Sequence, residues 1–265
     1  MSATGRILVH GHRGARAVLP ENTMAGFLYA LQAGADALEL DVGVTKDGAV
    51  VVTHDPRVNS EICLGPHPGN ALRDLTLEEL REYDCGSRVN PRFPRQRPVP
   101  GARIPTLSEV LGLAAGSGVH FDIEIKSFPD HPELTPAPDA FARLVLDEIC
   151  RQQMESRVAV LSFDFRVLRA MHRLAPEIRL AALWEGGPRA FVETARSAEA
   201  GIASPMFPLV TRPQVEAAHE AGLQVVPWTA NSPEDWRKLI DAGVDGIITD
   251  DPAALITFLQ AEGLR

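Results

Sequence analysis

Residues 121–126, Phe-Asp-Ile-Glu-Ile-Lys, open the part of the chain that decides the fold. The alternation of apolar and polar side chains in this short stretch predicts a β-strand. From here to residue 265, strand-like and helix-like segments alternate regularly. The expected strands are Phe121–Lys126, Val158–Phe163, Leu180–Trp184, Ile202–Met206, Gln224–Thr229 and Gly246–Thr249. The expected helices are Asp139–Met154, Phe165–Leu174, Arg189–Ser197, Arg212–Ala221, Pro233–Ala242 and Pro252–Ala261.

The first fifth of the chain adds two more units of the same kind. A strand is predicted over Ile7–Gly11, a helix over Thr23–Ala33, and a second strand over Ala37–Thr45 with a short hairpin partner at Ala49–Thr53. The helix of this second unit is expected over Thr106–Ala115, after an interruption. Eight strand–helix units in about 250 residues predict a (β/α)8, or TIM, barrel. An open doubly wound sheet is the alternative, but no glycine-rich dinucleotide fingerprint opens the first unit. We expect one catalytic domain over residues 1–265.

The segment 57–104 interrupts the alternation and is predicted to be an insertion after the second strand. A helix is expected over Thr76–Tyr83, since Thr76 and Glu79 have the spacing of a capping box. A loop rich in proline and arginine follows at residues 90–98. Long loops in compact barrels are usually lids or binding elements. A substrate lid, an oligomer contact and a solvated basic loop all remain open, as does the oligomeric state.

Composition narrows the class of partner. The formal net charge of -9 argues against a nucleic-acid binder, but a local cationic cluster can still attract a small anionic substrate. No apolar run approaches the roughly 20 residues that span a bilayer, and residues 1–6 carry no signal-like apolar stretch. Cys63, Cys85 and Cys150 are too few and too scattered for a disulfide framework. Three free thiols suit a reducing compartment, so a cytoplasmic location is expected.

Strand parity predicts which side chains enter the barrel. In the strand at 37–45, Glu39 and Asp41 share one face, while Leu38 and Leu40 share the other. The apolar set should face the helices, which turns both carboxylates inward. Glu124 occupies an inward position of the strand at 121–126 by the same rule. These positions lie toward the carboxyl ends of their strands, where barrel enzymes place their active sites.

Three inward carboxylates predict a cation site. Glu39, Asp41 and Glu124 offer oxygen ligands without cysteine partners, a set that suits one Mg²⁺ or Ca²⁺ better than zinc. The alternative is a buried ion-pair network in which Arg13 and Lys126 neutralise the carboxylates. Convergence with two histidines on one rim favours the metal site.

His12 ends the first strand and His54 ends the hairpin, so adjacent units bring both to one rim. Near neutral pH an imidazole can take up or give up a proton, and two of them can serve the two sides of one phosphate. His10 shares the parity of His12 but lies deeper, and we expect it to be structural. A lone histidine is more often structural than catalytic.

Other rim residues are candidates for substrate contact. Arg13 would grip phosphate oxygens as a fork, and Lys126 would add a point charge where negative charge develops. Trp228 could form an apolar wall against the ligand's carbon skeleton, with ordinary packing as the alternative. Phe163 and Phe207 each end a strand, and packing is the favoured interpretation for both.

The motifs along the chain, taken in order, resemble those of the glycerophosphodiester phosphodiesterases. The resemblance covers nearly the whole chain except residues 57–103. The matching strings are His-Arg-Gly at 12–14, Pro-Glu-Asn-Thr at 20–23, Glu-Leu-Asp-Val at 39–42, Thr-Lys-Asp-Gly at 45–48, Val-Val-Thr-His-Asp at 51–55, Ile-Pro-Thr-Leu at 104–107, Glu-Ile-Lys at 124–126, Trp-Thr-Ala-Asn at 228–231 and Gly-Val-Asp-Gly-Ile-Ile-Thr-Asp-Asp-Pro at 243–252. The ordered set is specific, although each string alone would be weak.

The resemblance implies a (β/α)8 barrel that hydrolyses a glycerophosphodiester to an alcohol and sn-glycerol 3-phosphate with Mg²⁺ or Ca²⁺. Glu21–Thr23 would brace the first loop. By position, the three parts of the site would be the metal ligands Glu39, Asp41 and Glu124, the acid/base pair His12 and His54, and the phosphate contacts Arg13 and Lys126.

Several readings stay open beside this one. A lysophospholipase-D-like or phospholipase-C-like activity on lipids is the alternative within enzymes, and it predicts an exposed apolar rim. The nucleophile could be water or the substrate's own glycerol 2-hydroxyl. A non-catalytic phosphate-ligand binder on the same fold is disfavoured because both histidines are present.

Overall fold

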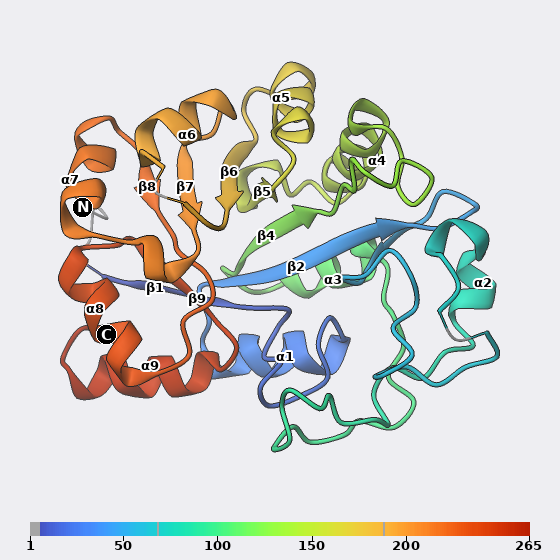
Figure 1. Cartoon of the computed structure of the whole chain (residues 1–265). Coiled ribbons are helices and arrows are strands. Elements are labelled where there is room, and N and C mark those ends of the chain that lie inside the picture. Colours follow the sequence, from blue (N-terminus) through green and yellow to red (C-terminus); the bar gives the residue numbers. More distant parts are fainter. Residues whose placement is uncertain (1–5, 68, 188) are drawn as a thin grey trace.

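Parallel strands arranged in a nearly closed barrel form the centre of the molecule, as the sequence predicts (Figure 1). The computed structural model describes residues 6–67, 69–187 and 189–265. Within these residues eight parallel strands follow the order β8-β7-β6-β5-β4-β2-β1-β9, and β3 pairs with β2 in the antiparallel sense. The strands are β1 (Leu8–Gly11), β2 (Ala37–Val44), β3 (Val50–Val52), β4 (His120–Ile125), β5 (Val158–Ser162), β6 (Arg179–Trp184), β7 (Ile202–Pro205), β8 (Gln224–Val225) and β9 (Gly246–Thr249).

Backbone hydrogen bonds link the two ends of this order. Asp245 N donates to Val225 O at 2.9 Å, and Ile248 N donates to Pro227 O at 3.0 Å. The strand predicted over 224–229 ends early, because Pro227 has no N–H with which to continue the ladder. The barrel is thereby completed next to Trp228 and Thr229, at the carboxyl end of β8.

Helices surround the strands and connect them (Figure 1). They are α1 (Met24–Ala33), α2 (Leu77–Leu80), α3 (Leu107–Leu111), α4 (Pro138–Arg151), α5 (Phe165–Leu174), α6 (Phe191–Ser197), α7 (Arg212–Glu220), α8 (Pro233–Ala242) and α9 (Pro252–Ala261). The bounds of α5, α8, α9 and β9 agree with the prediction. No helix in the described part of the chain is both long and apolar enough to cross a membrane.

The helix expected over 76–83 is shorter than predicted. Thr76 and Glu79 do form the capping box, with Thr76 Oγ1 accepting from Glu79 N. After Leu80 the chain continues in i→i−3 turns, in which Tyr83 N donates to Leu80 O at 3.3 Å. Tyr83 is buried and donates its hydroxyl to His67 O at 2.8 Å, so tertiary packing ends the helix there.

Burial follows the predicted strand parity. Leu38 and Leu40 are fully buried in the apolar layer between strands and helices. A separate cluster inside the barrel includes Leu161, Leu183 and Ile248. The layer of the barrel interior that contains this cluster is therefore apolar, whereas the inward carboxylates are charged groups in the same interior.

Two cavities lie at opposite ends of the barrel. The amino-end cavity, of about 490 Å³, opens among the first residues of the strands, such as Leu8 and Arg179. The carboxyl-end cavity, of about 320 Å³, contains His12 and His54. Leu161 and Ile248 line both cavities, and so form part of the partition between them.

The segment 57–104 lies beyond the carboxyl end of β2 (Figure 1) and has a small core of its own. Asp84 is its polar centre: its carboxylate accepts from Ser87 Oγ at 2.6 Å and from the backbone N–H groups of Gly86, Ser87 and Gly101 at 2.9 Å. Hydrogen bonds, that from Ser87 first, lower the pKa of Asp84 to about 2.

The prediction of three free thiols is wrong. Cys63 and Cys85, 22 residues apart, form a disulfide within the core of the segment 57–104. Cys150 is exposed and free in the described part of the chain. A disulfide is typical of oxidising environments, so the argument from free thiols for a cytoplasmic location no longer holds.

Candidate active site

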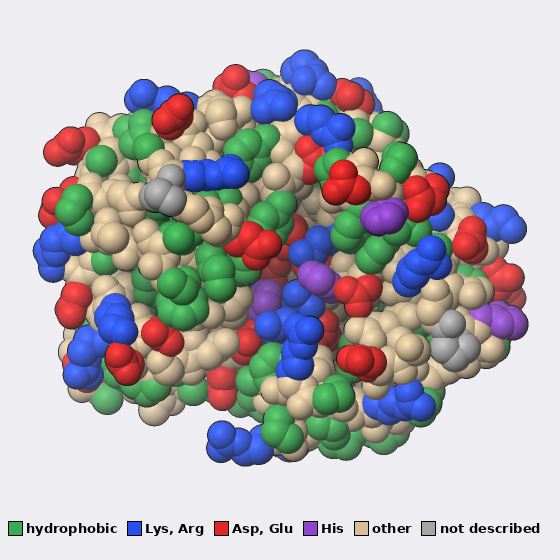
Figure 2. All heavy atoms as spheres, in the orientation of Figure 1, with side chains coloured by type: hydrophobic (Ala, Val, Ile, Leu, Met, Phe, Trp, Pro, Cys, Tyr) green, Lys and Arg blue, Asp and Glu red, His purple; other side chains and the backbone are tan. Residues whose placement is uncertain are grey.

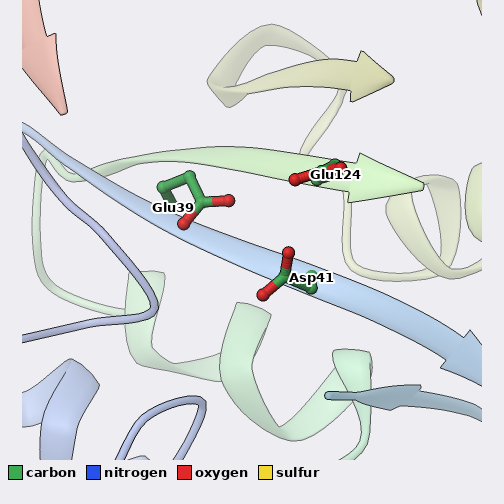
Figure 3. Close-up of side chains that lie close together, drawn as sticks. All are labelled: Glu39, Asp41 and Glu124. Carbon is green, nitrogen blue, oxygen red and sulfur yellow. The ribbon is translucent and has the colours of Figure 1, made fainter. Parts of the chain in front are cut away.

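Three carboxylates meet inside the carboxyl end of the barrel (Figure 3). Glu39 and Asp41 extend from β2 and Glu124 from β4, where Asp41 and Glu124 are paired in register. All three are buried, and one oxygen of each lies within 4.8 Å of the others. Strand parity therefore predicted both the direction and the convergence of these side chains.

Burial and mutual repulsion give the three carboxyl groups different affinities for protons. Burial, together with the charges of Asp41 and Glu124, raises the pKa of Glu39 well above its usual range. Burial also raises the pKa of Glu124, against the opposing charge of Lys126. Burial opposes ionisation of Asp41 as well, but Arg13 and Lys126 outweigh it and hold the pKa of Asp41 well below its usual value.

Arg13 and Lys126 contact the carboxylates, as the ion-pair alternative requires. Arg13 Nε lies 3.1 Å from Asp41 Oδ2, and Lys126 Nζ lies 2.7 Å from Glu124 Oε1 and 3.2 Å from Asp41 Oδ1. Glu39 accepts a hydrogen bond of 2.9 Å from the Arg13 backbone N–H. Arg13 also donates to Glu21 at 2.8 Å, so its positive charge is shared between Glu21 and the carboxylate cluster.

The donor set fits a divalent cation. Three carboxylates face two cationic side chains. In the described part of the chain the buried Asp41 Oδ1 accepts no hydrogen bond, although Lys126 Nζ lies 3.2 Å away as an ion-pair partner. Buried carboxylates normally have full sets of donors or a bound ion. Burial is the first cause of the raised pKa of Glu39, and the neighbouring charges of Asp41 and Glu124 add to it. Glu39, Asp41 and Glu124 could hold a hard cation through oxygen alone.

His12 is held from behind by a network that includes Asp250. His12 Nδ1 donates to Asp250 Oδ1 at 2.6 Å, Arg16 Nε donates to the same oxygen at 2.6 Å, and Asn231 Nδ2 donates to Asp250 Oδ2 at 2.7 Å. Burial lowers the pKa of His12 to about 4, despite the opposing effect of Asp250. His12 is thus a neutral imidazole whose Nε2 lies 3.8 Å from Glu39 Oε2.

His54 has a similar partner in a more exposed setting. Its Nδ1 donates to Asp55 Oδ1 at 2.8 Å, and Asn59 Nδ2 donates to Asp55 Oδ2 at 2.9 Å. The hydrogen bond from His54 lowers the pKa of Asp55. The His54 side chain is 34% exposed against 10% for His12, so the two imidazoles reach the cavity from different depths.

The carboxyl-end cavity brings the predicted residues together, and Lys/Arg, Asp/Glu and His side chains gather near the middle of the face in Figure 2. Asp41 lies beneath it. The predicted residues that line it are His12, Arg13, Glu39, His54, Glu124, Lys126 and Trp228.

Two aromatic side chains form one wall of the carboxyl-end cavity. Trp228 is partly buried and donates its indole N–H to Ser204 O at 2.9 Å. The interpretation of Phe163 as a packing residue is wrong: it is 42% exposed and meets Trp228 edge-on at 5.3 Å. Phe163 directly follows β5 and has the same parity as Ala159 and Leu161, whose side chains lie inside the barrel, so it lines the carboxyl-end cavity. Phe207 does pack against the core, as predicted.

The loop after β1 is braced as the motif at 20–23 implies. Asn22 Nδ2 donates to Asp41 Oδ2 at 2.9 Å, and Thr23 caps α1. Asn90, from the segment 57–104, donates to Glu21 Oε2 at 3.0 Å. Gly14 has φ +85°, and a Cβ there would lie 2.7 Å from the backbone of Gly26, so this turn requires glycine both for its conformation and for the close approach of the two backbones.

The residue-by-residue interpretation of the sequence gave no role to four residues that contact the two histidines or their aspartate partners. These are Asp250, Asp55, Asn59 and Asn231. Asp250 lies 238 residues from its partner His12. The available signal was the string at 243–252, which ends β9 beside β1 and places a carboxylate next to the end of the first strand. His10 lies deeper in the barrel, where its Nδ1 bonds Asp122 and its side chain lines the amino-end cavity, and its structural role stays a prediction.

The fold and the site define a barrel phosphodiesterase. The model of the Glycerophosphoryl diester phosphodiesterase family matches residues 12–254. A glycerophosphodiester phosphodiesterase of Caldanaerobacter subterraneus subsp. tengcongensis is 35% identical over 258 residues, which cover 97% of this chain and 100% of that protein. The chain belongs to the glycerophosphoryl diester phosphodiesterase family.

Solved structures agree with this fold. A Silicibacter pomeroyi DSS-3 protein assigned as a glycerophosphoryl diester phosphodiesterase superposes with a TM-score of 0.90 at 34% identity, covering 97% of this chain and 94% of that one. An Oleispira antarctica phosphodiesterase, solved with the product sn-glycerol-3-phosphate, has a TM-score of 0.82 at 23% identity, with coverage of 97% and 98%. At that identity the second likeness supports the fold alone.

Proposed function

We propose that the chain hydrolyses glycerophosphodiesters to an alcohol and sn-glycerol 3-phosphate, with one divalent cation, Mg²⁺ or Ca²⁺. The observation that carries the proposal is the joint placement in one cavity of the buried carboxylate cluster and two histidines, each oriented by an aspartate. Family membership supplies the reaction class, and the glycerophosphodiester phosphodiesterase of Caldanaerobacter subterraneus subsp. tengcongensis, at 35% identity, supports the choice of phosphodiester.

Glu39, Asp41 and Glu124 would hold the cation. A divalent cation bound there would supply positive charge that stabilises the phosphate oxygens as the ester bond breaks. Arg13 would orient the diester through its guanidinium fork, and Lys126 would add a compact charge beside it. Both side chains already lie against the carboxylate cluster, so they are positioned before the substrate arrives.

The two histidines would move the protons. In both, Nδ1 donates to an aspartate, which leaves Nε2 as the nitrogen that can exchange a proton with a bound diester. One imidazole would accept the proton of the nucleophile, and the other would protonate the departing alkoxide. The nucleophile is either water or the glycerol 2-hydroxyl; the second would give a cyclic phosphate that water then opens.

We also propose that residues 1–265 act as one catalytic unit, with the segment 57–104 as an insertion that helps to shape the site. Asn90 contacts Glu21 beside Arg13, and Arg92 lines the carboxyl-end cavity. These two contacts are explained if the segment 57–104 shapes the site, and they are not explained if it is only a solvated loop.

Release of glycerol 3-phosphate from a panel of glycerophosphodiesters tests the proposed function. We expect release with added Mg²⁺ or Ca²⁺ and none after exhaustive chelation by EDTA. Detection of a cyclic glycerol phosphate by ³¹P NMR would identify the 2-hydroxyl as nucleophile. Full activity after chelation would exclude the cation, and the absence of any release across the panel would exclude the reaction.

A further inference from the structure

One wall of the carboxyl-end cavity is mainly apolar and carries a single carboxylate. It is formed where β5, β6 and β8 end, by Phe163, Leu183, Glu185 and Trp228. The charged groups that would handle the phosphate come from the other side of the barrel, mainly from β1, β2 and β4. One substituent of a bound diester would therefore lie against this wall.

Glu185 differs from the other acidic residues of the cavity because no residue in the described part of the chain pairs with it. Glu39 accepts from the Arg13 backbone and Glu124 pairs with Lys126, whereas Glu185 makes no hydrogen bond or ion pair within residues 6–67, 69–187 and 189–265. It is exposed and directly follows β6. Its charge is thus available to a ligand without the cost of breaking an existing pair.

The aromatic groups beside Glu185 also favour a cation. Trp228 is fixed by its hydrogen bond to Ser204 O, and Phe163 is held edge-on against it at 5.3 Å. Lys126 Nζ lies over the Phe163 ring, 5.7 Å from its centroid, so this ring already contacts one cation and the wall adjoins one of the groups that would bind the phosphate. Ring faces attract ammonium groups, including methylated ones that cannot donate hydrogen bonds.

The same wall suits a polyol or an anion less well. Several hydroxyl groups would need several fixed hydrogen-bond partners, and where β5, β6 and β8 end the cavity offers only the Glu185 carboxylate and the Thr229 hydroxyl among apolar side chains. Arg92 also lines the cavity and would favour an anion, but in the described part of the chain no ion pair joins it to Glu185. The unpaired carboxylate and the two rings lie together on one wall, whereas Arg92 comes from the segment 57–104.

We propose that Glu185, together with Phe163 and Trp228, selects glycerophosphodiesters whose alcohol carries an ammonium group. The inference rests on the proposed function and names the substrate class of the same site. Glu185 would contact the ammonium group of the leaving alcohol, remote from the phosphorus, and acts as a specificity-determining residue.

The test compares kcat/KM for glycerophosphocholine and glycerophosphoglycerol in the wild-type protein and in Glu185→Gln. We expect wild type to prefer glycerophosphocholine and Glu185→Gln to lower that preference about 3- to 10-fold, as loss of one partly solvated charge contact implies. Glu177→Gln is the matched control, since Glu177 is exposed and precedes β6 at its opposite end. Arg92→Gln should not lower the preference.

Two results would overturn the inference: an unchanged preference in Glu185→Gln, or an equal loss on both substrates, which would place Glu185 against the glycerol common to both. If wild type hydrolyses neither diester, the proposed function fails. The role of Glu185 is then tested by calorimetry, as the ratio of the Kd values for the two diesters in wild type and in Glu185→Gln. Lysophosphatidylcholine, measured in parallel, distinguishes a lipid source of the ammonium group from a free diester.

Discussion

Asp250→Asn removes a negative charge from behind His12 while nearly preserving the shape of the side chain. The carboxylate accepts from His12 and Arg16 on one oxygen and from Asn231 Nδ2 on the other. An amide has one oxygen, so its NH₂ group must face a donor on one of these two sides. Asn231 cannot rotate to relieve this, because its Oδ1 accepts from Asp250 N at 2.8 Å and Thr249 Oγ1 at 3.2 Å.

The size of the effect follows from these contacts. A hydrogen bond to a charged group contributes about 1.5–3 kcal/mol, which corresponds to roughly 10- to 100-fold in rate. If the amide NH₂ faces His12 Nδ1, the imidazole must carry its proton on Nε2, and the wrong tautomer extends the loss toward about 10⁴-fold. We therefore expect kcat for glycerol 3-phosphate release to fall about 10- to 10⁴-fold, with a smaller change in KM.

The double variant Asn231→Asp/Asp250→Asn separates charge from hydrogen bonding. It restores a complementary partner for every donor and the original net charge, but moves the carboxylate to the far side from His12. We expect its melting temperature to approach that of wild type while kcat stays low. A folded Asp250→Asn variant with kcat within about threefold of wild type would refute the role of the charge, as would full recovery in the double variant.

Four further predictions concern turnover and stability. His12→Ala and His54→Ala should each lower kcat about 10²- to 10⁴-fold while Mg²⁺ still raises the melting temperature; near-normal turnover would remove that histidine from the mechanism. EDTA should abolish activity, and added Mg²⁺ or Ca²⁺ should restore it. Because the pKa of Asp84 is lowered to about 2, the ionised carboxylate stabilises the fold above about pH 4, and this contribution is lost as the pH falls toward 2. The melting temperatures of wild type and Asp84→Asn should therefore converge at low pH. A difference that stays constant with pH would contradict this. Replacing Cys63 and Cys85 by alanine should cost roughly 3 kcal/mol in urea unfolding, from the 22-residue separation, and an unchanged midpoint would show that the disulfide contributes nothing.

Local periodicity was sufficient to predict the barrel and the carboxylate cluster. Glu39 and Asp41 lie two residues apart on one strand, so their common direction follows from the pleat alone. Parallel strands end at the same face, which brings Glu124 beside them without any knowledge of register. The helices α5, α8 and α9 begin and end at residues with strong local signals, such as Pro233 and Gly243 around α8.

Contacts that depend on the path of the chain were not predictable in this way. Parity does not decide whether Asp250 or Asp251 faces His12, because both lie just after the end of β9. The pairing of Cys63 with Cys85 depends on how a segment with little regular structure folds back on itself. The exposure of Phe163 depends on where β5 stops, and strand ends are the least certain part of a sequence pattern.

The partition formed in part by Leu161 and Ile248 has a consequence for engineering. These two side chains line the cavities at both ends of the barrel, so shortening either one would thin the wall along the barrel axis. Ile248 is almost fully buried, and its truncation to alanine would add space between the two cavities. A barrel opened from end to end would admit solvent behind the site, and a designer could use such an axial tunnel to deliver or remove a small molecule without passing the mouth.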